Sequence, residues 1–140
     1  MICWQAMSNA TKLIAGIILI TVPTIEYGGT FLLRILSGKD RQFNEFQRSM
    51  FRAGHAHAGV LVILAIVAQI LMDQARLPEA VGWAVRMGFV LTALLVSGGF
   101  FGGAMGKDRP GGLIALLWIG VFLLAGSAIT LGIGLIAARE

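Results

Sequence analysis

The sequence predicts an all-α integral membrane protein whose four transmembrane helices form an antiparallel up-and-down bundle, as a single domain over residues 1–140. The first reason is composition, since 57% of the residues are hydrophobic and only 13% are charged, whereas soluble domains carry about 25% charged residues. The second is that the apolar residues fall into four runs separated by short polar segments. Each run is long enough for a spanning helix, which needs roughly 20 residues, and short links make neighbouring helices antiparallel.

The spans are predicted at about 11–36, 51–72, 79–105 and 112–138. Residues 44–51 have apolar side chains at helical spacing among basic ones, which predicts a short helix on the membrane surface leading into the second span. Pro78 and Glu79 suit the first turn of the third helix, because proline needs no backbone donor there and an acid complements the helix dipole.

Small residues in the third and fourth spans predict close helix packing. Residues 98–103 are rich in glycine, and Gly126, Thr130 and Gly134 form one stripe of the fourth span. Small residues at this spacing let helices approach closely in lipid. The glycine segment is also compatible with a planar cofactor near the backbone. It lacks the preceding strand and the lysine of a phosphate-binding loop.

Lysine and arginine residues predict the orientation in the membrane. Seven lie on the side of the first and third connections (Arg34, Lys39, Arg41, Arg48, Arg52, Lys107, Arg109) and four on the other (Lys12, Arg76, Arg86, Arg139). Because cytoplasmic loops are enriched in basic residues, the first and third connections are expected in the cytoplasm and both termini outside. The one cysteine, Cys3, excludes an intrachain disulfide.

Both histidines of the chain lie in the segment MFRAGHAHAG, residues 50–59, where a basic segment passes into an apolar run. Successive residues of a helix turn by about 100°, so His55 and His57 point in nearly opposite directions and cannot chelate one ion together. His57 shares a stripe with small residues and is expected to face the bundle. His55 is expected to face a second surface, either a partner chain or the lipid headgroups.

Three interpretations of the histidines remain open. The rings hydrogen-bond to backbone or polar side chains and hold the helix ends in place; or they ligate haem or a transition metal, imidazole being the commonest metal ligand near neutral pH; or they form a proton relay. Haem with two axial ligands would need His57 from two subunits, or a methionine such as Met50 or Met105 beside it.

Glu26 is the other unusual polar residue, because a carboxylate near the middle of a span is costly unless it is neutral, paired or hydrated. One interpretation is a neutral carboxyl hydrogen-bonded to the backbone carbonyl that Pro23 leaves free. The others are an ion pair with Arg86 and coordination shared with His57.

Three segments of the chain resemble a family of small bacterial four-helix membrane proteins. They are Pro23 to Gly29 with Leu32-Leu33-Arg34, then Arg52 to Leu61 with its RAGHAHAG sequence, and then Gly99-Phe100-Phe101. The resemblance covers most of the chain and implies the four-helix fold and the bacterial inner membrane, but no reaction. The second span alone is also similar to haem-bearing helices of the haem–copper oxidase superfamily.

These observations lead to three functional hypotheses. The first is a bacterial inner-membrane protein that binds haem or a metal through His57 and His55, with Glu26 nearby, as a redox-associated or accessory subunit. The second is a small oligomeric transporter or proton-conducting protein with a polar path through Glu26, His57 and Arg86. The third is a structural subunit of a larger membrane complex. The sequence has no nucleophile and base set, no carboxylate pair and no signature of nucleic-acid binding.

Overall fold

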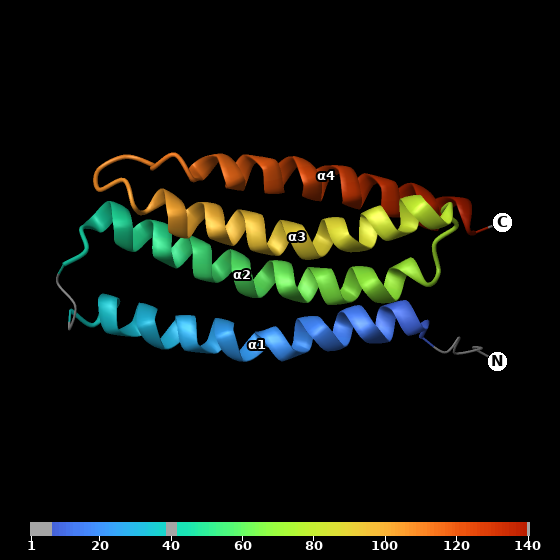
Figure 1. The fold of residues 1–140 in the computed structure, drawn as a ribbon, viewed down its shortest axis with the longest axis horizontal. Helices are drawn as coiled ribbons and strands as arrows, with labels where there is room; N and C mark the ends of the chain where they lie inside the picture. The colour runs from blue at the N-terminus through green and yellow to red at the C-terminus, as the bar shows by residue number, and fades with distance from the viewer. Residues whose placement is uncertain (1–6, 39–41, 140) are drawn as a thin grey trace.

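The computed structural model describes residues 7–38 and 42–139, and these form an all-α bundle of four long helices (Figure 1). The all-α fold class is therefore confirmed for the described residues. Cys3, Lys39 and Arg41 lie outside them. Each helix is long and apolar enough to cross a membrane. The helices are α1 (Asn9–Leu36), α2 (Glu45–Met72), α3 (Glu79–Gly103) and α4 (Ile114–Ala137).

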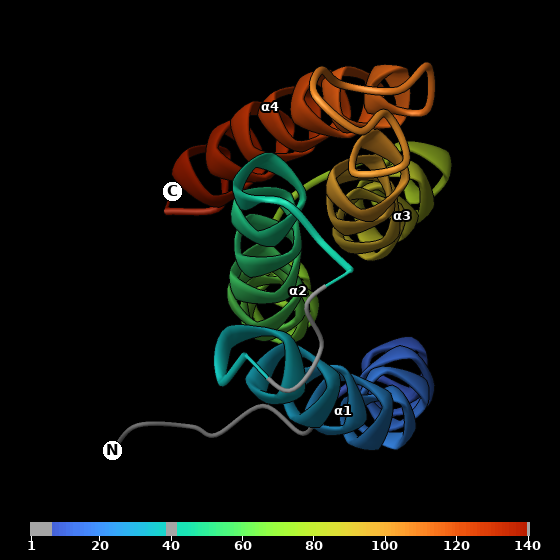
Figure 2. The ribbon, with the colours of Figure 1, turned by 90° about the vertical axis from the view of Figure 1, so that its left-hand side faces the viewer.

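The helices pack in chain order rather than around one central axis. In Figure 2, α1 lies against α2, α3 lies beside α2, and α4 crosses over α3 and α2. At one end, the side-chain amide of Asn44 donates to the backbone carbonyl of Lys107. At the other end, Ser8 bonds to Asp73. We call these the basic end and the opposite end; the basic end carries Arg34, Arg48, Arg52, Lys107 and Arg109.

Helix α2 begins at Glu45, earlier than the predicted start of the second span, and it is continuous through the histidines. Asn44 starts it with a capping box, in which its side chain accepts from the backbone N–H of Gln47 and the Gln47 side chain accepts from the backbone N–H of Asn44. This pairing satisfies two otherwise free backbone donors. The segment 44–51, expected to be a short helix that leads into the second span, forms the N-cap and the first turns of α2 without a break. His57 therefore lies about 18 Å from the start of the helix, at about 1.5 Å per residue.

Four phenylalanine rings fasten α1 to the rest of the bundle at the basic end. The ring of Phe51 lies 5.8 Å from that of Phe31, 5.1 Å from that of Phe43 and 5.9 Å from that of Phe101. The pairs of Phe51 with Phe31 and Phe43 are edge-to-face, and the pair with Phe101 is tilted at 33°. Edge-to-face pairs at such distances stabilise beyond the area that they bury. The cluster sets the position of α1 on α2 close to the histidines.

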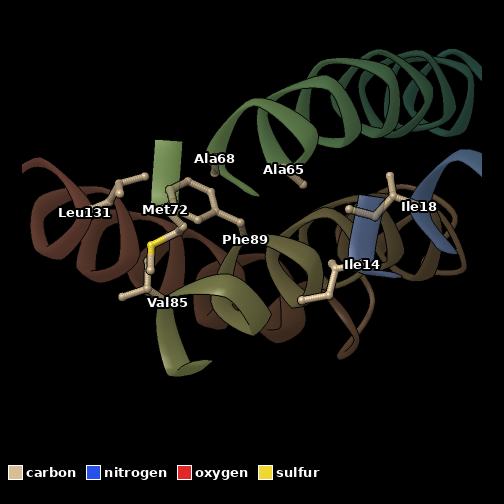
Figure 3. Close-up of a cluster of buried hydrophobic side chains, with 8 residues drawn as sticks. All are labelled: Ile14, Ile18, Ala65, Ala68, Met72, Val85, Phe89 and Leu131. Atoms are coloured by element: carbon tan, nitrogen blue, oxygen red, sulfur yellow. The ribbon is translucent and has the colours of Figure 1, made fainter. Parts of the chain in front are cut away.

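A buried hydrophobic cluster connects all four helices in the half of the bundle towards the opposite end (Figure 3). Alanines on α2 allow α1 to approach closely, and Phe89 of α3 fills the centre at 3% exposure. The members are Ile14, Ile18, Ala65, Ala68, Met72, Val85, Phe89 and Leu131. Many large apolar side chains outside the cluster are exposed, among them Ile20, Leu33 and Ile63, which is compatible with a surface that faces lipid.

Glycines make the contact between α3 and α4 close. A Cβ built on Gly99 would lie 2.8 Å from the Cα of Leu117, and one built on Gly120 would lie 3.0 Å from the backbone nitrogen of Val96. The predicted packing role of the segment 98–103 is thus supported by Gly99, although its neighbour Gly98 faces open space. Gly126 also has nothing within 4 Å of its built Cβ, so the predicted contact stripe of α4 is wrong at that residue.

Candidate functional site

The first candidate residue, His55, lies between α2 and α1. It is half-buried, and its ring lies against a glycine pair: a Cβ built on Gly29 would be 3.2 Å from its Cε1, and one built on Gly28 would be 3.7 Å from its Nδ1. The glycines are needed here because a side chain would crowd the ring. The expectation that His55 faces the headgroups or a partner chain is wrong, since α1 of the same chain covers this side.

His57 points to a different neighbour. Its Nδ1 lies 2.8 Å from the carbonyl oxygen of Ala53, one turn earlier in α2, and its ring centre lies 4.8 Å from that of Phe100 on α3. A carbonyl oxygen only accepts, so Nδ1 carries the hydrogen in this bond. In the neutral ring, Nε2 then has a free lone pair. His57 faces the bundle as predicted, but it is an exposed residue and not a buried one.

Beside His57 the surface is hollowed into an apolar recess of about 190 Å³. Three helices line it, and His57 is the only polar residue of the lining. The residues are His57, Leu61, Val96, Phe100, Leu117, Val121 and Leu124. Because the wall of the recess is apolar, little water competes with a ligand for the imidazole nitrogen there.

The two histidine rings therefore project from opposite sides of α2, as the helix geometry predicts. His55 contacts α1 and His57 contacts α3, so they form no common ligand pair. Across residues 7–38 and 42–139 there is no group of three or more His, Cys, Asp or Glu side chains that could hold a metal ion. Any metal at His57 would need ligands from outside this part of the chain.

Glu26 lies on the outside of α1. It is exposed, and no hydrogen bond or ion pair joins it to another residue within 7–38 or 42–139. The expected bond to the carbonyl freed by Pro23 is absent there. The expected ion pair with Arg86 is wrong, because Arg86 pairs with Asp73.

Arg86 is the centre of a buried polar cluster at the opposite end. Its Nη2 donates to Asp73 Oδ1 at 2.7 Å, and its Nη1 donates to Thr11 Oγ1 at 2.8 Å and to Gln69 Oε1 at 3.1 Å. Ser8 completes the cluster by donating to both carboxylate oxygens of Asp73. Residues of α1, α2, the α2–α3 connection and α3 thus meet around one guanidinium, which is what removes Arg86 from any contact with Glu26.

The Asp73 carboxylate is held ionised by this cluster. Burial by itself raises the pKa of Asp73, but hydrogen bonds from the backbone and side chain of Ser8, from Arg86 and from Thr11 outweigh burial and lower that pKa from 3.8 to about 2. Hydrogen bonds that favour the charged form act in this direction. The ion pair is a structural joint of the opposite end.

Acidification is expected to weaken this joint. In the unfolded chain Asp73 has its ordinary pKa of 3.8, against about 2 in the fold, so the unfolded chain binds more protons between these values and stability falls as the pH falls. The contribution of about 2 kcal/mol is complete above about pH 4 and is lost as the pH passes down through about 2.

The measurement is detergent-solubilised unfolding of the wild type and of Asp73→Asn at about pH 6 and about pH 2.5. At about pH 6 the wild type should be more stable than Asp73→Asn, and at about pH 2.5 the difference in stability between the two proteins should be smaller. A difference of the same size at both values would contradict this role of the carboxylate.

The sequence alone does not identify Ser8, Thr11, Gln69 and Asp73 as partners of Arg86. One signal was present, because Gln69 is a polar residue near the end of an otherwise apolar stripe of α2. No protein-family model, curated protein or solved structure matches this chain.

Proposed function

We propose that this protein is a multi-pass protein of the bacterial inner membrane that binds haem or a transition metal ion through Nε2 of His57, as a redox-associated or accessory subunit. The four helices cross the bilayer in antiparallel order. The basic end lies in the cytoplasm, following the excess of lysine and arginine there, and both termini lie outside.

The observation that carries the proposal is the hydrogen bond between Nδ1 of His57 and the Ala53 carbonyl. Histidines that bind metals usually donate their other ring N–H to a carbonyl or carboxylate, which fixes the tautomer and the ring orientation. Here the ring is also held by Phe100. These two contacts hold the ring at the recess that His57 lines, where Nε2 is proposed to take the ligand.

The donor set favours haem over a bare ion. The porphyrin supplies four equatorial nitrogens by itself, so the protein has to supply only one or two axial ligands. A bare ion usually needs three or four protein ligands, and residues 7–38 and 42–139 offer no such group. Phe100 beside the imidazole provides an apolar wall for the edge or face of a macrocycle.

A second axial ligand from the same chain is not supported. Met50 is buried against Gly103 and lies about 10 Å from His57 along α2, at about 1.5 Å per residue. Met105 is 77% exposed and follows α3 at the basic end. The second ligand is therefore proposed to come from another subunit.

Titration of the purified protein with haemin tests the proposal. The wild type is expected to develop a shifted, intensified Soret band that saturates at a fixed stoichiometry, because Nε2 enters the iron coordination sphere. His57→Ala should lose this change. His55→Ala is the matched control, since it removes the same ring two residues away but on the side that faces α1, and it should retain the band.

Two results would overturn the proposal. One is a wild-type spectrum no different from haemin in empty micelles. The other is an equal response in His57→Ala and the wild type. Circular dichroism of each variant checks that the helices are intact.

A further inference from the structure

Helix α1 is the least covered helix of the bundle. Only 6% of the residues in its most apolar stretch are buried, compared with 50% in that of α3. It carries the one acidic side chain within its apolar run, Glu26, which is exposed and has no partner in the described chain. A carboxyl at this depth facing lipid alone is costly, so a group that satisfies it is expected to cover this part of α1.

Glu26 and His57 lie at the same height in the bundle. Thr11 contacts Gln69 while Gly29 contacts His55, so α1 and α2 run in opposite directions. From the level where Gly29 meets His55, Glu26 is about 4.5 Å further towards the opposite end and His57 is about 3 Å further in the same direction, at about 1.5 Å per residue. The two side chains are therefore within about 2 Å of each other in height.

Within one chain the two groups cannot meet. His55 faces α1, and two residues of helix turn by about 200°, so His57 points away from α1 towards α3. The body of α2 separates Glu26 from the recess at His57. A neighbouring chain in the same membrane, rotated about an axis along the membrane normal, presents its Glu26 at the height of this recess.

We propose that a second copy of this chain covers the recess and places the carboxyl of its Glu26 against Nε2 of His57. The two groups are complementary, since the carboxyl and the imidazole nitrogen share one proton in a hydrogen bond. The recess of about 190 Å³ is apolar apart from His57, so a side chain inserted there finds one polar partner. The contact satisfies both groups that one chain leaves unpartnered.

The contact joins two different faces, the outside of α1 and the recess between α2, α3 and α4. Such a head-to-tail interface closes into a ring when it is repeated by rotation. The inference builds on the proposed function because it concerns the same nitrogen, Nε2 of His57. One lone pair cannot bind iron and Glu26 at once, so the contact belongs to the assembly without haem.

Photocross-linking in intact membranes tests the inference without altering either group. The photoreactive residue p-benzoylphenylalanine is placed at Val60, which is 65% exposed and one turn from His57. Illumination should give a covalent dimer, and mass spectrometry should find the second chain joined through the part of α1 around Glu26. Glu26→Leu, in the same background, should abolish the dimer. Glu45→Leu removes an acid from the basic end and should not.

Several outcomes would overturn the inference. They are no dimer, a dimer joined through α3 or α4 of the second chain, or a dimer that persists in Glu26→Leu. No haemin is added, so a negative result here leaves the haemin titration to stand by itself. A negative titration likewise leaves the cross-link unaffected.

Discussion

Replacing Arg86 with methionine is expected to destabilise the folded protein by about 3 to 5 kcal/mol, the cost of removing one partner of a buried ion pair. The side chains of Arg86 and Asp73 are only 10% and 12% exposed. Without the guanidinium, the Asp73 carboxylate keeps Ser8 and Thr11 but loses its counter-charge, and Gln69 loses its donor. Equilibrium unfolding in mixed detergent and dodecyl sulfate micelles measures the difference.

Arg76→Met is the matched control for this change. Arg76 lies at the same end of the bundle with an exposed side chain, and its backbone N–H donates to the carbonyl of Gly134. Within residues 7–38 and 42–139 its side chain has no hydrogen bond or ion pair. Its replacement should change stability by less than about 0.5 kcal/mol. If the two arginine variants lost the same stability, the buried cluster would not be the joint that the structure indicates.

The effect of Arg86 can be separated from that of Asp73 with a double-mutant cycle. Neighbours in one hydrogen-bond network usually show coupling of about 0.5 to 3 kcal/mol. Because the two side chains share a 2.7 Å ion pair, Arg86→Met should cost clearly less in an Asp73→Asn background than in the wild type.

Gly99→Ala is expected to have the second largest effect, a loss of about 3 kcal/mol, at the upper end of what overpacking costs. The added Cβ would lie 2.6 Å from the Cβ of Leu117 and 2.8 Å from its Cα. Real Cβ atoms do not approach other atoms this closely, and a backbone atom cannot turn aside as a flexible side chain does. Helix α4 would have to move away from α3, and packing along the whole contact would loosen.

The neighbouring substitution Gly98→Ala provides the control. A Cβ on Gly98 meets nothing within 4 Å, and alanine is better than glycine in a helix by up to about 1 kcal/mol. Stability should therefore stay unchanged or rise. Melting curves of both variants in one detergent test the pair, and a Gly99→Ala protein as stable as Gly98→Ala would mean that α3 and α4 are not in backbone contact there.

Helix geometry predicts the relative directions of the two histidine rings from the sequence, but not their neighbours. The angle between His55 and His57 follows from the turn per residue, so the sequence correctly predicted that the two rings diverge. It could not identify the neighbour of each ring. That depends on the glycine pair of α1 fitting His55 and on Phe100 lying beside His57, and both are contacts between distant parts of the chain.

The ion pair predicted between Arg86 and Glu26 shows what the sequence could not determine. Both are charged residues in apolar runs, and opposite charges in such runs are reasonable partners. The predicted ion pair is wrong because the register of α1 on α2 places Glu26 far from the end of the bundle where Arg86 lies. In addition, Asp73 lies in the α2–α3 connection directly beside Arg86 and pairs with it. A loop residue gives no sign in the sequence that it folds back onto a helix.

The sequence by itself determined the number of helices, their approximate positions and their membrane-compatible character, because these depend on local composition and on the length of each apolar run. Tertiary structure alone decided which faces of the helices meet, and with them the partners of every polar group. Helix faces are chosen by the fit of many small contacts, such as the glycines of α3 against α4, and no single residue encodes that fit. Glu26 was thereby left uncovered and His57 open, although the sequence had marked both.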